Sequence, residues 1–399
     1  MAEFGLLGER LSHSWSPALH KALGGYDYDL FSVAPEALGQ FLEATPCRGL
    51  NVTIPYKKAV LPHCAALSPV AKRLGSVNTL LRRGDGWYGD NTDYTGFCKL
   101  MQGFRVRGAD ALVLGSGGAG VMAAQALRDL GARQVEVVSR TGRVHYGNLN
   151  RSADLIVNAT PVGMYPENGH APIDLREFPN CGGVVDLIYN PLRTKLLLEA
   201  ETLGIAHENG LPMLVAQAQA AAALFLGRDV PDSSEICKDF QKKTENIVLI
   251  GMPGCGKSTV GALLAQALHR PFFDADVILA ARYGAIAEIF AAQGEAAFRA
   301  METQVLAELG KMTGIVLATG GGAVVKEENY PLLRQNGTLF WLCRPLSALP
   351  IEGRPLSRQA TPAALYAQRE ERYRAWASHR IQNTGTPDQT VAAIMEVIA

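Results

Sequence analysis

The sequence predicts an α/β protein with parallel sheets and two separate nucleotide-binding turns. Short apolar runs alternate with helical patterns almost from end to end, which is typical of parallel strands covered by helices. A glycine-rich turn, LGSGGAG, occupies residues 114–120. A second turn of a different kind, IGMPGCGKSTV, occupies residues 250–260.

The expected strands are apolar runs bounded by turn residues. They are residues 111–115, 134–139, 154–160 and 183–189 in the first half and residues 246–251 and 340–342 in the second. Alanine- and leucine-rich stretches such as residues 120–132 lie between several of them and have the pattern of helices. The polar, charge-mixed stretch 227–246 separates the two sets and is the best linker candidate, so we expect the main boundary near Glu245.

The composition is that of a globular protein with full apolar cores. Of 399 residues, 48% are hydrophobic and 19% are charged, the reverse of a disordered chain. The formal net charge is zero, so no basic excess favours nucleic acid or an anionic membrane as a partner. The sequence has neither a run of 18 apolar residues nor an amino-terminal leader pattern. We therefore expect a cytoplasmic protein.

The seven cysteines are scattered along the chain, at positions 47, 64, 98, 181, 237, 255 and 343. No two of them form a C-x-x-C pair, and their number is odd. This usage predicts reduced thiols rather than a disulfide framework.

The first glycine turn follows an expected strand and opens an expected helix, as a dinucleotide-binding fingerprint requires. Gly115, Gly117 and Gly120 give the G-x-G-x-x-G spacing. This spacing lets the backbone approach a pyrophosphate at the amino terminus of a helix. Glycines needed only for packing would give the same pattern.

The end of the next strand indicates which dinucleotide is bound. It reads Ser139, Arg140 and Thr141, with no acidic residue to hold a ribose 2′-hydroxyl. A guanidinium suits a 2′-phosphate, so Arg140 favours NADP over NAD. An arginine that is merely exposed at a strand end is the alternative.

Four polar clusters accompany this first turn, and each lies beside an apolar run. They offer Ser14 and Ser16, then Asn51, Thr53 and Lys57, then Asn78, and finally Thr92 and Asp93. One such cluster would be an ordinary turn, but four suggest a pocket for a small polyhydroxylated acid. In that pocket a lysine and an aspartate could handle a proton while hydride moves.

With these motifs, residues 1–236 resemble shikimate dehydrogenase. The resemblance rests on S-x-S-x-P, NVTIPYK, the G-x-V-N-T and D-N-T-D boxes, G-x-G-G-A, NATPVGM (158–164) and NGLPMLVAQ (209–217). It implies a substrate-binding α/β domain at 1–95, completed by 210–236, and a Rossmann-type NADP-binding domain at 96–209. A linker at 237–245 would follow.

The resemblance also implies roles for individual residues. Lys57 and Asp93 would be the catalytic pair. Substrate would be bound by Ser14, Ser16, Thr53, Asn78, Tyr189 and Gln217. The cofactor would be held by Gly115, Ser116, Gly117, Gly118, Ala119, Ser139, Arg140, Thr141, Leu187 and Gly210. The segment 142–153 is shorter than the family leads us to expect, so we predict that one flanking helix of the cofactor domain is missing.

The second glycine turn, GMPGCGKS, satisfies the P-loop pattern G-x-x-x-x-G-K-[ST] between an expected strand and an expected helix. Its backbone amides would cradle the phosphates of a nucleotide. The residues concerned are Gly254, Cys255, Gly256, Lys257, Ser258 and Thr259. Lys257 would reach the β/γ oxygens, and Ser258 would coordinate Mg²⁺.

Residues downstream of the P-loop suggest an acceptor site. Asp274 and Asp276 stand two apart, on one side of what we expect to be an extended segment, and one could serve a metal and the other an acceptor hydroxyl. Arg299 and Glu302 stand three apart on one helical face. ATGGGAV (318–324) is a strand that ends in three glycines, where backbone can approach a ligand. Taken singly, each arginine in this region is at least as well explained as a solvated surface residue.

Together these motifs resemble shikimate kinase over residues 246–399. The resemblance implies that Asp276, Arg299, Gly321 and Arg369 bind shikimate, with Asp276 catalytic near the attacking hydroxyl and Lys257 catalytic at the phosphates. Ser258 and Asp274 would serve Mg²⁺, and Arg354 would close over the phosphates of ATP from the lid. The lid region 343–357 is compact for the family.

The two turns would then serve consecutive steps, because reduction of 3-dehydroshikimate gives the shikimate that the kinase phosphorylates. Three alternatives stay open. The chain could be a non-catalytic sensor of shikimate-like acids, although the intact Lys57, Asp93, Lys257 and Asp276 argue against this. The dehydrogenase could act on quinate with NAD, which Arg140 argues against. The kinase half could survive as an inactive appendage.

Overall fold

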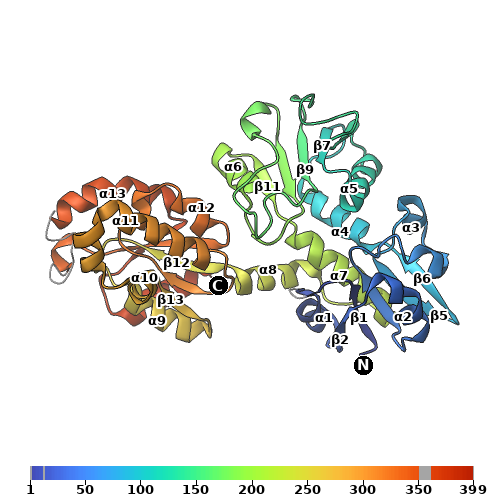
Figure 1. Ribbon diagram of the computed structural model, residues 1–399, viewed down its shortest axis with the longest axis horizontal. Coiled ribbons are helices and arrows are strands. Elements are labelled where there is room, and N and C mark those ends of the chain that lie inside the picture. Colours follow the sequence, from blue (N-terminus) through green and yellow to red (C-terminus); the bar gives the residue numbers. More distant parts are fainter. Residues whose placement is uncertain (1, 12–13, 350–360, 399) are drawn as a thin grey trace. The chain divides into compact units, whose positions relative to one another are not determined.

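The structure, a computed structural model, describes residues 2–11, 14–349 and 361–398 (Figure 1). Its contacts divide the chain into two compact units. The first comprises Met1–Tyr189 and Leu196–Phe240, and the second comprises Asn190–Lys195 and Gln241–Ala399. The predicted α/β class is confirmed, because each unit combines sheets with covering helices.

The first unit begins with a mixed six-stranded sheet. In the order β2-β1-β3-β5-β6-β4, its strands are Tyr28–Ser32, Phe4–Gly8, Gly49–Val52, Thr79–Arg83, Gly86–Asp90 and Cys64–Leu67. β5 runs antiparallel to both β3 and β6, and the other pairs are parallel. The accompanying helices are α1 (Ser16–Gly24), α2 (Leu38–Ala44), α3 (Pro69–Leu74), α4 (Thr92–Leu100) and α7 (Leu211–Leu226).

The second sheet of this unit is parallel throughout and carries the first glycine turn. In the order β11-β10-β9-β7-β8, its strands are Ala206–Glu208, Gly183–Asp186, Leu155–Asn158, Asp110–Leu114 and Gln134–Val138. Its helices are α5 (Gly118–Asp129), which follows β7, and α6 (Lys195–Leu203), which follows β10. No helix forms between β8 and β9, where all of residues 139–154 are described, as the short segment there predicts.

The stretch expected to be a linker is helical. α8 spans Ser233–Thr244, and the division between the two units falls inside it, after Phe240. Its sequence is mostly polar and Ser233 is its one fully buried residue, although Ile236, Cys237 and Phe240 are half-buried on one side of the helix. This polar majority explains why it resembles a linker. Glu235 in the first turn and Lys242 and Lys243 in the last turn complement the helix dipole.

The second unit has one parallel five-stranded sheet with helices on both sides (Figure 1). In the order β13-β14-β12-β15-β16, its strands are Phe272–Asp274, Val316–Ala318, Asn246–Ile250, Gly337–Cys343 and His379–Gln382. Its helices are α9 (Lys257–Leu268), α10 (Ala275–Tyr283), α11 (Ile286–Leu309), α12 (Asn329–Arg334), α13 (Pro362–Trp376) and α14 (Pro387–Ile398).

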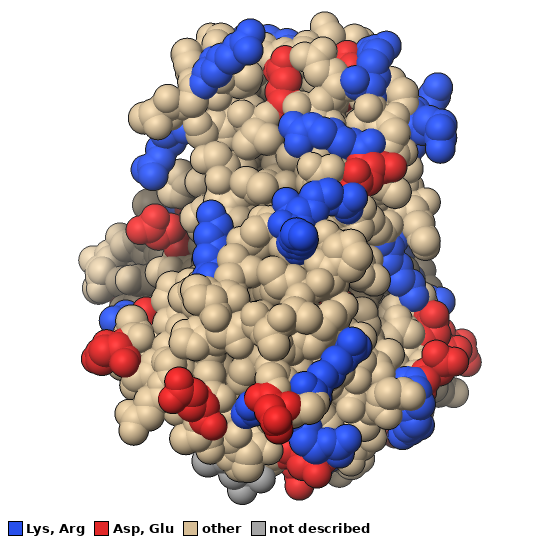
Figure 2. Space-filling model, turned by 90° about the vertical axis from the view of Figure 1, so that its right-hand side faces the viewer, with Lys and Arg blue, Asp and Glu red and all other residues tan. Residues whose placement is uncertain are grey.

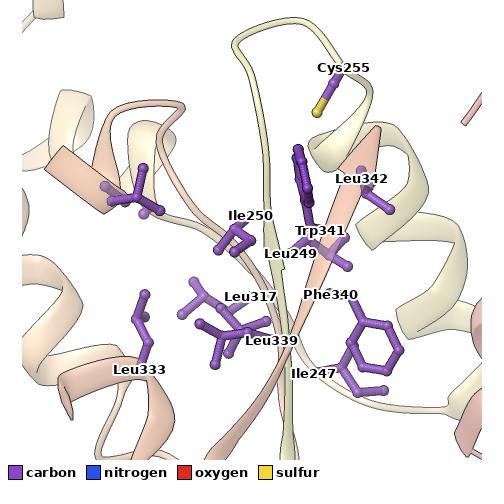
Figure 3. Packing of buried hydrophobic residues seen from close by; sticks show 14 of the residues in the cluster. Ile247, Leu249, Ile250, Cys255, Leu317, Leu333, Leu339, Phe340, Trp341 and Leu342 are labelled. Atoms are coloured by element: carbon purple, nitrogen blue, oxygen red, sulfur yellow. The ribbon is translucent and has the colours of Figure 1, made fainter. Parts of the chain in front are cut away.

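The core of the second unit surrounds its two central strands. Figure 3 shows Ile247, Leu249 and Ile250 of β12 beside Phe340 and Trp341 of β15. All of these side chains are buried, and burial of apolar surface is the main source of fold stability. The loop that leaves β12 therefore starts from a rigid base.

The surface carries charges of both signs. On the face in Figure 2, Lys and Arg side chains are interspersed with Asp and Glu side chains and with wide uncharged areas, in keeping with the net charge of zero. Among the described helices, none combines the length and the apolar character that crossing a membrane requires.

Candidate active sites

The two serines of the first polar cluster lie side by side at the start of α1. Ser14 Oγ donates a hydrogen bond to Ser16 Oγ (3.0 Å) and accepts one from the Ser16 backbone N–H (3.2 Å). Both hydroxyls face a cavity of the first unit. The start of a helix thus presents two adjacent hydroxyl groups to a ligand.

The chain turns sharply after β3 and brings a lysine to the same cavity. The Thr53 N–H donates to the carbonyl of Leu7 (2.9 Å), and the Tyr56 N–H donates back to the carbonyl of Thr53 (2.9 Å). Lys57 follows, and its Nζ lies 2.5 Å from Asp93 Oδ2. The Lys57 side chain is 34% exposed and that of Asp93 is 17% exposed. Both side chains can therefore contact a ligand in the cavity while the protein shields them from most of the solvent.

Asp93 is positioned by the beginning of α4. Asn91 caps this helix by accepting a hydrogen bond from the Tyr94 N–H (3.3 Å). A carboxylate in the first turn interacts favourably with the positive end of the helix dipole. The Asn91 cap and the helix dipole of α4 therefore hold Asp93 in place opposite Lys57.

The orientation of the Asn78 amide is set by its neighbours. Its Oδ1 accepts from the Thr92 backbone N–H (2.6 Å), and its Nδ2 donates to Thr92 Oγ1 (3.0 Å). The second Nδ2 hydrogen is left for a ligand in the cavity that Asn78 lines. Asn78 therefore offers a donor, which suits a ligand hydroxyl or carboxylate oxygen.

These groups share one cavity of about 320 Å³. Of the residues predicted from the sequence, it is lined by Ser14, Ser16, Asn51, Thr53, Lys57, Asn78, Asp93, Gly118, Ala119, Leu187, Tyr189, Gly210 and Gln217. Residues from four polar clusters and from the start of α5 thus converge, as the sequence predicts. The other predicted cofactor residues do not line this cavity: Gly115, Ser116, Gly117, Ser139, Arg140 and Thr141.

Those remaining residues follow the ends of β7 and β8. The Gly115 N–H donates to the carbonyl of Val138 (2.8 Å), so the glycine turn lies beside the strand that leads to Arg140. Burial raises the pKa of the Tyr146 phenol, and the nearby positive charge of Arg140 opposes this rise. Arg140 follows the end of β8 beside the glycine turn, and its contact with a 2′-phosphate stays a prediction.

The glycine turn needs glycine for two different reasons. Gly115 has a φ of +108°, which side-chain-bearing residues rarely adopt. A Cβ on Gly120 would lie 1.9 Å from the carbonyl oxygen of Gly115. Gly120 therefore lets α5 start in direct contact with the turn.

The second site is built on the P-loop between β12 and α9. Gly251, Gly254 and Gly256 have φ values of +144°, +79° and +99°. A Cβ on Gly251 would also meet the carbonyl oxygen of Leu342 at 2.6 Å. The loop is therefore pressed against the end of β15, and its amides at the start of α9 can face phosphate groups.

The side chains of the P-loop are already engaged within the unit. Lys257 is 7% exposed, and its Nζ donates to the carbonyls of Gly251 (2.9 Å) and Met252 (3.1 Å). Ser258 Oγ donates to Asp274 Oδ2 (2.5 Å). The cation and the hydroxyl thus lie within the loop that a nucleotide would enter.

Asp274 and Asp276 lie differently from the prediction that they share one side of an extended segment, because the chain turns into α10 at Ala275. Asp274 ends β13 and caps α10, accepting the N–H of Asp276 at 3.0 Å. Asp276 lies in the first helical turn and lines the cavity, whereas Asp274 contacts Ser258.

Two oxygen atoms that could bind a metal ion meet in this arrangement. Ser258 Oγ and Asp274 Oδ2 are hard oxygen donors of the kind that Mg²⁺ prefers, and Mg²⁺ commonly takes its other ligands from water and substrate phosphates. Within the described ranges, no three His, Cys, Asp or Glu residues form a cluster that could hold a metal ion on its own. The donor set fits a magnesium ion that arrives with a nucleotide.

Arg299 is held by an acid on the same helix. Its Nη1 donates to Glu302 Oε2 (2.7 Å), three residues further along α11, as the spacing predicts. The two side chains are 5% and 2% exposed. Burial raises the pKa of Glu302, and the positive charge of Arg299 opposes the rise.

The three glycines after β14 each leave room for a different neighbour. A Cβ on Gly320 would meet the carboxylates of Glu302 (2.5 Å) and Asp276 (2.7 Å). On Gly321 it would meet the ring of Pro253 (2.5 Å) in the P-loop, and on Gly322 it would meet the guanidinium of Arg299 (2.2 Å). The glycine run is thus the point where the P-loop and the acceptor side of the site touch.

Arg369 approaches the same run from α13. Its Nη1 donates to the carbonyl of Gly321 (3.1 Å), and Tyr373 donates to the same oxygen (2.5 Å). The Nε of Arg369 is buried without a partner among the described residues, as is Oε1 of Glu302. Both atoms belong to residues that line the cavity.

This second cavity has a volume of about 730 Å³. Of the predicted residues it is lined by Gly254, Gly256, Lys257, Ser258, Thr259, Asp276, Arg299, Gly321 and Arg369. Cys255 is buried beneath the loop. Arg354 lies outside the described residues, as does most of the lid.

Comparisons with known proteins agree with the two families that the sequence resembles. A shikimate dehydrogenase (NADP(+)) from Clostridium perfringens strain SM101 is 35% identical over 260 residues, covering 59% of this chain and 96% of the relative. A family model described as the shikimate dehydrogenase substrate binding domain matches residues 6–80. This chain belongs to the shikimate dehydrogenase family.

Two solved structures extend the match to the fold. A chorismate mutase/shikimate 5-dehydrogenase fusion protein from Clostridium acetobutylicum is 36% identical with a TM-score of 0.57, covering 60% of this chain and 97% of the other. The shikimate 5-dehydrogenase of Thermus thermophilus, in complex with NADP(H) and shikimate, is 36% identical with a TM-score of 0.55, covering 60% of this chain and 98% of the other. The two-domain dehydrogenase architecture predicted for the first half is confirmed.

The second unit matches a different family. The shikimate kinase family model covers residues 253–399, which include most of the P-loop and the whole acceptor side of the larger cavity. The chain is thus a shikimate dehydrogenase part followed by a shikimate kinase domain, as the sequence indicates.

Sequence reasoning missed several residues that line the cavities. In the dehydrogenase unit they include Lys58, Ser76, Asn91, Met122, Met213 and Leu214. Met213 lies four residues before Gln217 on α7, so helical spacing alone could have found it. In the kinase unit Arg344 lines the cavity directly after β15, and its place at the carboxyl end of a parallel strand is a usable signal.

We expect Gly120→Ala to weaken NADPH binding strongly, because its methyl group would overlap the Gly115 carbonyl and move the turn away from α5. Gly103→Ala is the matched control, since a Cβ there meets nothing within 4 Å. Fluorescence titration of NADPH on both variants gives the comparison. Equal affinities would show that the close approach at Gly120 does not shape the cofactor turn.

Proposed function

We propose that this chain reduces 3-dehydroshikimate with NADPH in its first unit and phosphorylates shikimate with ATP in its second. The observation that carries the proposal is the Lys57–Asp93 pair, at 2.5 Å, in one cavity with two adjacent hydroxyls and the start of α5. The shikimate kinase match supports the second activity. The product of the first reaction would be the substrate of the second.

In the dehydrogenase site, the residues of the cavity would divide into binding and proton-handling groups. Ser14 and Ser16 would bind the carboxylate of the substrate, and Asn78 would donate to a ring hydroxyl. Lys57, held by Asp93, would supply or steer a proton to the oxygen of the ketone as negative charge develops there. NADPH supplies the hydride when it is bound.

In the kinase site, catalysis would consist mainly of positioning and charge neutralisation. Arg299 and Arg369 would hold the carboxylate of shikimate, and Asp276 would accept a hydrogen bond or a proton from the attacking hydroxyl. Lys257 would exchange its contacts with the Gly251 and Met252 carbonyls for phosphate oxygens. We propose that Ser258 and Asp274 hold Mg²⁺ directly or through water, and this ion would neutralise phosphate charge.

The competing interpretations are weaker. A sensor of shikimate-like acids would not need an acid–base pair at 2.5 Å in its pocket. An inactive kinase appendage would not need buried arginine and glutamate side chains with unpartnered atoms at the cavity. Packed apolar residues at the same positions could stabilise the fold equally well, so fold stability does not require either feature.

Single substitutions should impair one of the two activities and leave the other unchanged. We expect Lys57→Ala to lower kcat for 3-dehydroshikimate reduction by about 10²–10⁴-fold and to leave shikimate phosphorylation unchanged. Lys257→Ala should do the reverse, with a loss on the order of 10²–10³-fold. Steady-state assays of both activities on both variants make each substitution the control for the other. If either variant kept its own step at the wild-type rate, the role given to that lysine would be wrong.

The cofactor preference should depend on Arg140. We expect Arg140→Ala to raise the KM for NADPH about tenfold or more, because a charge-assisted hydrogen bond contributes about 1.5–3 kcal/mol, and to leave the KM for NADH unchanged. Arg151→Ala is the matched control, since Arg151 is exposed and already paired with Glu177 (2.9 Å). An equal rise for both cofactors would contradict recognition of the 2′-phosphate by Arg140.

A further inference from the structure

A buried asparagine of the kinase unit contacts the P-loop from outside the cavity. Asn383 directly follows β16 and is 6% exposed. It is not among the described residues that line the second cavity, and nothing in the proposed mechanism uses it. Its side chain nevertheless reaches the P-loop, because its Nδ2 donates a hydrogen bond to the carbonyl of Cys255 at 2.6 Å.

Two hydrogen bonds determine which end of the Asn383 amide faces the loop. A backbone carbonyl can only accept, so the group in contact with Cys255 is the NH₂ group of the amide. The other end, Oδ1, accepts from Thr390 Oγ1 at 2.7 Å. Thr390 lies on α14 and is 2% exposed. The hydroxyl of Thr390 therefore stabilises the one amide orientation that can donate to the loop.

The backbone of Asn383 is anchored to the end of the sheet. Its N–H donates to the carbonyl of Cys343 (2.7 Å), the last residue of β15. The preceding carbonyl of β15, that of Leu342, lies against Gly251 at the beginning of the P-loop. Asn383 thus holds the loop from the same strand end against which the loop already packs.

The P-loop has a flexible peptide at the point that Asn383 contacts. Cys255 stands between Gly254 and Gly256, which have φ values of +79° and +99°, and glycine adopts positive and negative φ about equally well. The Cys255 side chain itself is buried in the core of the unit (Figure 3). The hydrogen bond from Asn383 therefore restrains a peptide group that its flanking glycines would leave free to rotate.

The direction of one phosphate-binding amide follows from this restraint. The carbonyl of Cys255 and the N–H of Gly256 belong to one peptide group, and in a trans peptide these two bonds point in opposite directions. Gly256 lines the cavity, whereas Asn383 does not. A carbonyl held by Asn383 therefore directs the Gly256 N–H toward the cavity, where it can donate to a phosphate oxygen.

We propose that Asn383 is a positioning residue of the nucleotide site and that Thr390 keeps its amide in the required orientation. The proposal rests on the proposed kinase function. It adds that residues after β16 and on α14, outside the P-loop motif, set the affinity for the nucleotide phosphates. An asparagine that only satisfies a buried carbonyl would stabilise the unit without affecting this affinity, and the experiment separates these two roles.

The first measurement is calorimetric binding of ADP, in the presence of Mg²⁺, to the full chain. We expect Asn383→Leu to raise the Kd for ADP about tenfold, because the buried Cys255 carbonyl loses its donor and the peptide can rotate. The KM for shikimate should change less, since Arg299 and Arg369 come from other elements. Binding of ADP needs no turnover, so it reports on the site even if phosphorylation is slow.

The second measurement tests Thr390 with two substitutions of similar size. Thr390→Val removes the hydroxyl and should raise the Kd for ADP about threefold, because the Asn383 amide is no longer held in one orientation. Thr390→Ser keeps the hydroxyl and should bind ADP as the wild type does. Thr390 is not among the described residues that line the cavity, so a difference between the two variants is transmitted through Asn383.

The matched control is Ile394→Ala, also on α14. Ile394 is fully buried, so its truncation lowers the thermal stability of the unit by lost packing without removing a hydrogen bond of Asn383. The positioning role predicts weaker ADP binding for Asn383→Leu that Ile394→Ala does not share. Equal Kd values for these two variants would make Asn383 a structural residue only, and equal values for Thr390→Val and Thr390→Ser would overturn the role of Thr390.

The wild-type chain separates this proposal from the proposed function. A wild-type chain that binds ADP but does not phosphorylate shikimate would refute the kinase activity, and the comparison of Kd values would still decide the role of Asn383. A wild-type chain that does not bind ADP in the presence of Mg²⁺ would overturn both.

Discussion

Both sites depend on backbone segments that approach one another more closely than side chains allow. In the dehydrogenase unit α5 begins against the Gly115 carbonyl, and a Cβ on Gly120 would leave 1.9 Å between the two. In the kinase unit the P-loop meets the run after β14, where a Cβ on Gly321 would lie 2.5 Å from Pro253. Because these contacts set where helix amino termini point, they determine where phosphate groups can bind.

Three cations of the two sites are engaged before a ligand arrives. Lys57 contacts Asp93, Lys257 contacts two loop carbonyls, and Arg299 contacts Glu302. Such contacts hold long, flexible side chains in one geometry, so little of their conformational freedom remains to be lost on binding. Neutral side chains of the dehydrogenase unit are also engaged. The Tyr28 hydroxyl donates to Asn51 Oδ1, and Asn51 Nδ2 donates to Thr79 Oγ1.

The fold and most of the site residues could be predicted because they belong to short, continuous sequence motifs. Strand, glycine turn and helix follow one another within about 20 residues at Gly115 and at Gly251, and the spacing of Arg299 and Glu302 implies their contact. Contacts between distant segments could not be predicted in this way. For example, nothing in the sequence around Tyr28 points to Asn51, which accepts a hydrogen bond from its hydroxyl, because β2 and β3 flank β1 only in the folded sheet. Likewise, α8 resembles a linker because most of its residues are polar and its apolar residues are only half-buried.

The most direct test of the account is a single reaction that contains the purified chain, 3-dehydroshikimate, NADPH, ATP and Mg²⁺. Loss of nicotinamide absorbance is followed together with mass spectrometry of the products. The account predicts shikimate 3-phosphate, formed with equal consumption of NADPH and ATP. Accumulation of unphosphorylated shikimate would contradict an active kinase unit, and unchanged NADPH would contradict the proposed dehydrogenase.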